Sequence, residues 1–150
     1  MSINIHLNMG KLKELATTFI RRSKSTPQPT RAHSHPIVNK GWGHELIIVN
    51  KPSYCLKQLH FQYGKQCSWH KHKLKDETFY VHSGSFLILI GYSRNIKHAK
   101  SLRLKAGDSL HIPTGMYHRM MGTHITTPNI LTEVSTQHFD HDSIREVKGD

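Results

Sequence analysis

The sequence predicts a small all-β fold preceded by a short helix and a linker. About nine short runs of alternating apolar and polar residues are separated by turn signals such as Asn50-Lys51-Pro52, Gly64-Lys65 and Ser83-Gly84. Short strands at such spacing are typical of antiparallel barrels and sandwiches. The 150 residues amount to one domain, and no internal repeat divides them.

The N-terminal part, residues 1–40, is expected to lie outside the barrel. Between Met9 and Ser23, apolar residues recur at helical spacing beside four basic side chains, which predicts a short amphipathic helix. Packing on the barrel or on a partner subunit is the simpler role for this helix, and membrane-surface or targeting function is the alternative. Residues 23–40 contain three prolines and many small polar residues, which predicts an extended linker. The barrel is then expected to span residues 41–150.

The strand expected over Tyr54–Tyr63 carries an unusual residue on its apolar face. If Leu59 and Phe61 point inward, the alternation of the strand also turns Lys57 inward. A lysine inside a barrel is costly unless it meets an anion. Lys57 is therefore a candidate substrate-binding residue, unless the register differs and leaves it in solvent.

A histidine-rich stretch over residues 64–84 predicts a metal site. His70 and His72 share one face if this stretch is a strand, and Glu77 follows on the next segment. A further candidate, His118, comes from a second stretch downstream. Since the chain has 14 histidines, a chance H-x-H is the alternative. Imidazole and carboxylate ligands suit one divalent transition metal, Fe, Mn, Zn, Ni or Co, and the sequence leaves its identity open.

These two stretches resemble the signature of the cupin family. Gly64–Gly84 matches the pattern G-x5-H-x-H-x4-E-x6-G at every defined position, and Gly107–His118 matches G-x5-P-x-G-x2-H. The chain departs from the second pattern at Gly122, a position expected in a turn, where the family usually has asparagine. The resemblance implies an antiparallel jelly-roll barrel that holds a metal. The implied metal ligands are His70, His72, Glu77 and His118.

A looser resemblance covers most of residues 41–148. The opening Trp42-Gly43-His44-Glu45, the strand with Lys57 and the tail from Thr132 to Arg145 are similar to sugar-isomerase cupins, which include mannose-6-phosphate isomerases and D-lyxose isomerases. This likeness implies a sugar or sugar phosphate as the small-molecule substrate. It also implies a homodimer.

The predicted site favours aldose–ketose isomerisation, although the sequence leaves turnover open. A divalent metal that polarises a sugar carbonyl acidifies the neighbouring C–H, and a base can move the proton through a metal-bound enediolate. Glu133, His44 and Tyr80 are the candidate catalytic bases, although strand alternation turns Tyr80 outward. Each also has an ordinary structural interpretation, because Glu133 could pair with Arg145 or Arg119, His44 could lie on the surface and Tyr80 could pack.

Two other functions stay open. Fe(II) at the same ligands could bind O₂ in a dioxygenase, but thiol dioxygenase cupins lack a carboxylate ligand such as Glu77. The second open function is sugar binding without turnover, in a cupin whose metal is structural. Oxygen consumption that requires Fe(II) would indicate the first function, and saturable sugar binding without turnover would indicate the second.

Composition and charge narrow the expected partners. The formal net charge of +11 permits contact with nucleic acid, a membrane surface or an anionic small molecule. No recognised nucleic-acid module is present, and no apolar run reaches the ~18 residues of a membrane span. The first residues lack the apolar core of a signal peptide. The two cysteines are expected to be buried free thiols, and the protein is expected to be cytoplasmic.

Overall fold

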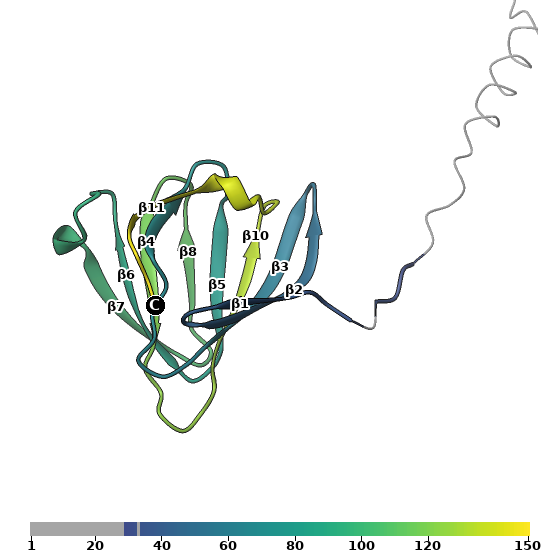
Figure 1. Ribbon diagram of the computed structural model, residues 1–150, viewed down its shortest axis with the longest axis horizontal. Coiled ribbons are helices and arrows are strands. Elements are labelled where there is room, and N and C mark those ends of the chain that lie inside the picture. The colour runs from purple at the N-terminus through teal and green to yellow at the C-terminus, as the bar shows by residue number, and fades with distance from the viewer. Residues whose placement is uncertain (1–28, 33) are drawn as a thin grey trace, which may run out of the picture. The chain divides into compact units, whose positions relative to one another are not determined.

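Two antiparallel sheets form the fold, which we describe from a computed structural model of residues 29–32 and 34–150 (Figure 1). The helix predicted for residues 9–23 lies outside the described residues. The strands belong to one unit, Ser34–Asp150. Within the described part of the chain, no helix has the length and hydropathy needed to cross a membrane.

Each sheet combines strands from distant parts of the sequence. The first sheet runs in the order β1 (Ile37–Lys40), β2 (Gly43–Lys51), β3 (Tyr54–Phe61), β10 (Asn129–Ser135), β5 (Glu77–Ser83) and β8 (Ser109–Ile112). The second runs in the order β11 (Ser143–Val147), β4 (Trp69–His72), β9 (Tyr117–Gly122), β6 (Ser85–Gly91) and β7 (Lys100–Lys105). Two short 3₁₀ helices, η1 (Ile96–His98) and η2 (Asp140–Asp142), connect strands. This arrangement confirms the predicted all-β class.

The hydrophobic core lies between the two sheets. Phe61 of β3 and Phe86 of β6 meet edge to face with ring centroids 5.5 Å apart, a geometry that aromatic pairs favour. Along β3, every second side chain is buried, as a strand with one face on the core requires. That alternation confirms that Lys57 points inward together with Leu59 and Phe61, since all three are buried.

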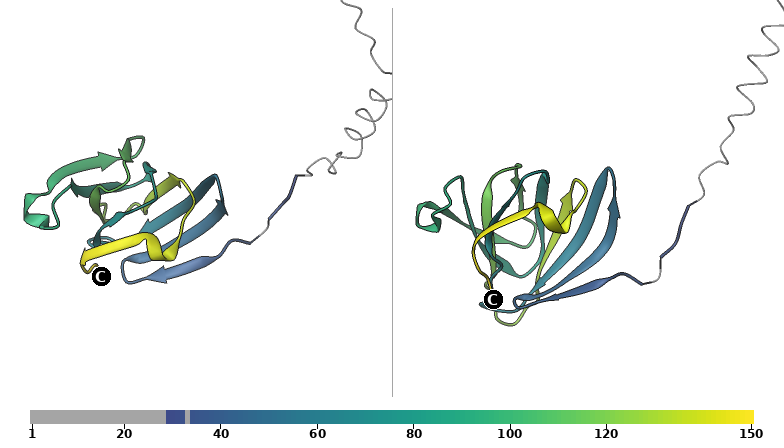
Figure 2. Two further views of the ribbon diagram at one scale, coloured as in Figure 1. Left: turned by 90° about the horizontal axis from the view of Figure 1, so that it is seen from above. Right: turned by 45° about the horizontal axis from the view of Figure 1, so that its top comes forward.

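Two strands, β1 and β11, lie in the predicted linker and in the C-terminal tail. β1 pairs with β2 from Ile37 to Lys40, so the sheet begins before residue 41, inside the predicted linker. All four of its residues are exposed, so backbone pairing alone makes this strand and no apolar alternation marks it. β11 lies in the tail and pairs with β4. Figure 2 shows the segment after β10 crossing from the first sheet to the second.

Glycines of the two motifs make the turns that set the strand registers. Gly64 and Gly84, which frame the first motif, have φ of 74° and 75°, a left-handed conformation that strains residues with a Cβ. Gly122 instead ends β9 and does not lie in the expected turn. A Cβ at Gly122 would lie 3.0 Å from Cβ of Phe61 and of Asn129, so close packing accounts for the glycine.

Candidate metal centre

Three histidine side chains converge inside the barrel. β4 supplies His70 and His72, and His118 on β9 is the register partner of His70. The candidate ligand nitrogens of the three residues all lie within 4.8 Å of one another. His118 and His72 are buried, with exposed fractions of 1% and 5%. The structure thus brings together three of the four predicted ligands, in a group that could hold a metal ion.

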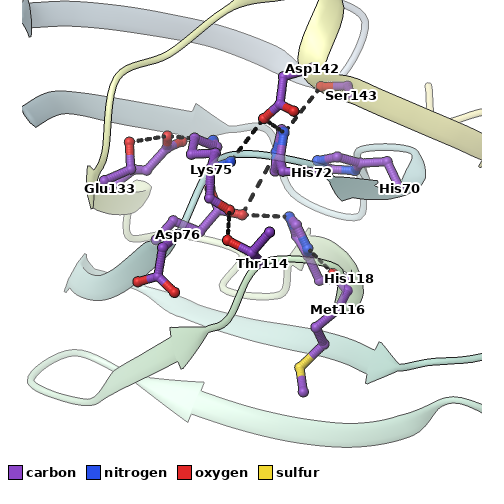
Figure 3. Close-up of polar contacts among 12 residues, drawn as sticks. His70, His72, Lys75, Asp76, Thr114, Met116, His118, Glu133, Asp142 and Ser143 are labelled. Atoms are coloured by element: carbon purple, nitrogen blue, oxygen red, sulfur yellow. Dashed lines mark hydrogen bonds and ion pairs between the residues drawn. The ribbon is translucent and has the colours of Figure 1, made fainter. Parts of the chain in front are cut away.

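Each imidazole is oriented through its Nδ1 atom (Figure 3). His70 Nδ1 donates to the Ser68 carbonyl at 2.9 Å, and His118 Nδ1 donates to the Met116 carbonyl at 3.1 Å. His72 Nδ1 lies 3.3 Å from Asp142 Oδ2. A proton on Nδ1 leaves Nε2 with its lone pair, which is the arrangement that metal-binding histidines adopt. The three residues therefore fit a divalent metal at their Nε2 atoms.

The buried carboxylate of Glu77 supports the same fit. Glu77 Oε1 lies 3.0 Å from His118 Nε2 and 3.7 Å from His72 Nε2. Both Glu77 Oε1 and His118 Nε2 are buried without a hydrogen bond. Lone pairs facing one another at this distance repel unless a proton or a metal ion lies between them. Glu77 is not a member of the converging histidine group, so its role as a fourth ligand stays a prediction.

Burial favours the neutral imidazoles of His70 and His72. Burial lowers the pKa of His70 well below its usual range, and the neighbouring His118 lowers it further. Burial also lowers the pKa of His72 to about 2, with Lys75 as the next largest cause. A metal ligand must be deprotonated, so these shifts favour binding.

A buried lysine bridges two carboxylates beside the histidines. Lys75 Nζ lies 2.5 Å from Glu77 Oε2 and 2.7 Å from Glu133 Oε1. Burial alone would lower the pKa of Lys75, but Glu133 and Glu77 raise it above its usual range. Burial alone would raise the pKa of Glu77, but His118 and Lys75 lower it to about 2. Lys75 was not predicted as a site residue, although two inward-facing carboxylates would have indicated a buried cation.

A cavity of about 300 Å³ joins the histidines to the other predicted residues that face inward. Its lining includes Glu77, Glu133 and Lys57. Lys57 has an exposed fraction of 2%, and its Nζ lies 3.3 Å from Glu45 Oε2. Lys57 therefore reaches the cavity, as the strand alternation predicts, but its charge is already paired.

Two predicted catalytic residues, His44 and Tyr80, lie away from this cavity, whose lining does not include them. His44 stacks on His60 with ring centroids 4.5 Å apart. Tyr80 is 45% exposed and lies between the buried residues Phe79 and Val81. Strand alternation explains both positions, because the neighbour of an inward residue points outward. The structure does not bring either side chain to the candidate metal centre.

Asp142 is a site residue that the sequence did not reveal. Its Oδ1 accepts hydrogen bonds from the backbone N–H groups of Lys73 and Leu74, each at 2.9 Å. Its Oδ2 accepts from the N–H of Lys75 at 3.0 Å and faces His72 Nδ1. The carboxylate is 2% exposed. Asp142 thus fixes both the orientation of His72 and the loop that carries Lys75.

We expect the substitution Asp142→Asn to weaken metal binding by roughly 10- to 100-fold, the usual effect of losing a residue that orients a ligand. The amide has one acceptor oxygen, so its NH₂ group would face either backbone N–H donors or His72 Nδ1–H. Competition titration with a zinc chelator measures this effect. Asp76→Asn is the matched control, because Asp76 is exposed and contacts His111. Equal zinc affinity of Asp142→Asn and wild type would contradict the assigned role.

Comparisons with known proteins agree with this description. The family described as "Cupin domain" matches residues 58–131. KdgF from Halomonas sp. is 18% identical with a TM-score of 0.62, and the match covers 77% of this chain and 97% of KdgF. The comparison with curated proteins gave no match.

Two longer proteins of known structure share the fold. The capsular polysaccharide assembling protein CapF from Staphylococcus aureus is 17% identical with a TM-score of 0.67, covering 90% of this chain and 41% of CapF. Oxalate decarboxylase from Bacillus subtilis is 12% identical with a TM-score of 0.66, covering 97% of this chain and 40% of that protein. The chain therefore spans about two fifths of these two proteins. The signature motif, the two-sheet fold and the family match agree, and the chain belongs to the cupin superfamily.

Proposed function

We propose that this cupin binds one divalent metal through His70, His72, His118 and Glu77, and that it isomerises a sugar or sugar phosphate. The observation that carries the proposal is the convergence of three imidazole nitrogens in one cavity with a second buried carboxylate, Glu133. A metal at this position would polarise a carbonyl oxygen and acidify the neighbouring C–H. The remaining requirement is a base within the cavity.

Glu133 is the residue that we assign as the base. Burial alone would raise the pKa of its carboxyl, but Lys75 lowers it below its usual range, so Glu133 is ionised at neutral pH. Lys75 Nζ and Ser135 Oγ both donate to Oε1. Among the described residues, Oε2 receives no hydrogen bond from another side chain. Oε2 is therefore the oxygen that would take a proton from the substrate and return it to the adjacent carbon.

The lysines of the cavity would position the substrate and the base. Lys75 holds the Glu133 carboxylate, and Lys57 lies opposite Glu133 in the register between β3 and β10. An ammonium next to a substrate oxygen can donate a hydrogen bond to a hydroxyl while it keeps its carboxylate partner. CapF, a fold neighbour named for capsular polysaccharide assembly, supports a carbohydrate substrate.

We expect Glu133→Gln to lower isomerisation by about 10²–10⁴-fold, the usual contribution of a positioned base. The assay is incorporation of solvent deuterium at the carbon next to the carbonyl, followed by NMR with the metal-loaded protein and a panel of aldoses, ketoses and their phosphates. Glu146→Gln is the matched control, because Glu146 pairs with Arg94 outside the cavity. Metal content should be equal in all three proteins. If metal-loaded wild type incorporates no deuterium into any sugar, isomerisation is contradicted.

Sugar binding without turnover is the second candidate function. Two observations favour it. Glu77 and Glu133 are both paired with Lys75 inside the cavity. Neither His44 nor Tyr80 lines the cavity, so neither can replace them as a base. Saturable binding of a sugar without deuterium incorporation would support this function. Oxygen uptake that depends on Fe(II) would instead indicate oxidative chemistry.

A further inference from the structure

All but two of the charged side chains that line the cavity have an ion-pair partner. Every acidic residue of the lining has a partner: Glu45 pairs with Lys40 and Lys57, Glu77 and Glu133 with Lys75, Asp140 with His138, and Asp150 with Lys65. Arg145 and Lys148 also line the cavity. In residues 29–32 and 34–150, neither of their side chains has an ion pair or a hydrogen bond. Arg145 and Lys148 are therefore the two cations of the lining that have no partner among the described residues.

The strand register places Arg145 beside the histidines. β11 pairs with β4 so that Arg145 lies opposite His70 and Ser143 lies opposite His72. Directly opposed residues of an antiparallel pair have side chains on the same face. Arg145 therefore points to the side of the sheet that carries the candidate metal ligands, and its exposed side chain lies at the cavity wall.

The backbone that carries both cations is fixed at each end. Arg119, which is 8% exposed, donates from one guanidinium nitrogen to the carbonyl oxygens of Val147 at 3.2 Å and Lys148 at 2.8 Å. At the other end, buried Asp142 ties the segment to the loop after β4. A fixed backbone limits the conformational entropy that Arg145 and Lys148 lose when they bind a ligand.

We propose that Arg145 and Lys148 bind an anionic group of the substrate, a carboxylate or a phosphate, at the wall of the cavity. This inference rests on the proposed function, since it names the class of sugar that the site would take. A planar guanidinium can hold either anion through two parallel hydrogen bonds, and a lysine adds a point charge. Lys57, the candidate substrate-binding residue of the sequence analysis, is buried and already paired with Glu45. The net charge of +11 is compatible with an anionic substrate.

The test compares the binding of charged and neutral sugars. Isothermal titration of the metal-loaded protein would use glucose, glucose 6-phosphate and glucuronate as probes, which separates phosphate from carboxylate recognition. Wild type should prefer one of the charged sugars to glucose. Arg145→Gln should weaken binding of that sugar by about 10- to 100-fold, the range for a hydrogen bond to a charged group, and leave glucose unchanged. Lys148→Gln should act in the same direction, and Arg103→Gln, an exposed cation of β7 outside the lining, should have no effect.

The outcomes separate this inference from the proposed function. A preference for a charged sugar that Arg145→Gln abolishes supports the anion subsite, even if no deuterium is incorporated into any sugar. Equal affinity of wild type for all three sugars, or a preference that survives in Arg145→Gln, overturns the subsite, even if isomerisation is observed. A wild-type protein that binds none of the three probes also overturns it.

Discussion

Replacing His118 by alanine is expected to cause the largest loss of metal affinity of any single substitution outside β4. The loss should exceed the roughly 10- to 100-fold effect of removing a residue that only orients a ligand. His118 is the one member of the histidine group that β9 supplies, and it is 1% exposed, so the substitution removes one of three converging nitrogens from a buried position. Zinc affinity by chelator competition measures the effect.

His60→Ala is the matched control for His118→Ala. His60 lies in β3 and stacks on His44 outside the cavity lining. The control should keep the wild-type zinc affinity, and circular dichroism should show that both variants are folded. If His118→Ala bound zinc as tightly as wild type, the metal would have to lie elsewhere.

Replacing Lys75 by methionine is expected to destabilise the metal-free protein by ~3–5 kcal/mol near neutral pH, the usual cost of removing one partner of a buried ion pair. Methionine keeps most of the side-chain volume and removes the charge. The Glu77 and Glu133 carboxylates, which are 2% and 4% exposed, would then be buried as anions without Lys75. Urea unfolding in the presence of a chelator measures the change in the free energy of unfolding.

The pH dependence of this loss identifies its cause. In wild type, the pKa of Glu77 in the folded protein is lowered to about 2. Ionised Glu77 therefore stabilises the fold at any pH above its unfolded pKa, and this contribution is lost only as the pH falls toward about 2. Without Lys75, burial should raise both carboxyl pKa values, so the variant should regain stability as the pH falls from about 7 to about 5. The triple variant Lys75→Met, Glu77→Gln, Glu133→Gln should recover much of the loss at pH of about 7. A loss that is equal at both pH values would contradict this explanation.

Much of the site was predictable because strand periodicity determines it. The H-x-H spacing places His70 and His72 on one face, and apolar alternation along β3 turns Lys57 inward. The same periodicity turns Tyr80 outward. These positions depend on local backbone geometry, which a sequence encodes directly.

The remaining site residues depend on contacts between distant segments. Lys75 lies in a loop, where no period specifies the direction of a side chain, and its partner Glu133 is 58 residues away. Asp142 belongs to a one-turn helix in a polar tail and contacts a loop 67 to 69 residues earlier. The sequence also offered Arg145 or Arg119 as the partner of Glu133, and neither pairs with it. Arg119 donates to backbone carbonyls, and Arg145 lines the cavity without a partner among the described residues. Such pairings need the tertiary fold.

The position of a bound zinc ion in crystals of the full chain tests the central claim most directly. An anomalous-difference map at the zinc absorption edge should show one peak at about 2.0–2.1 Å from Nε2 of His70, His72 and His118. The Glu77 carboxylate should turn from Lys75 toward the ion. A map without a peak after zinc is supplied, or with a peak only at another site such as the stacked pair His44 and His60, would contradict a metal centre in the cavity.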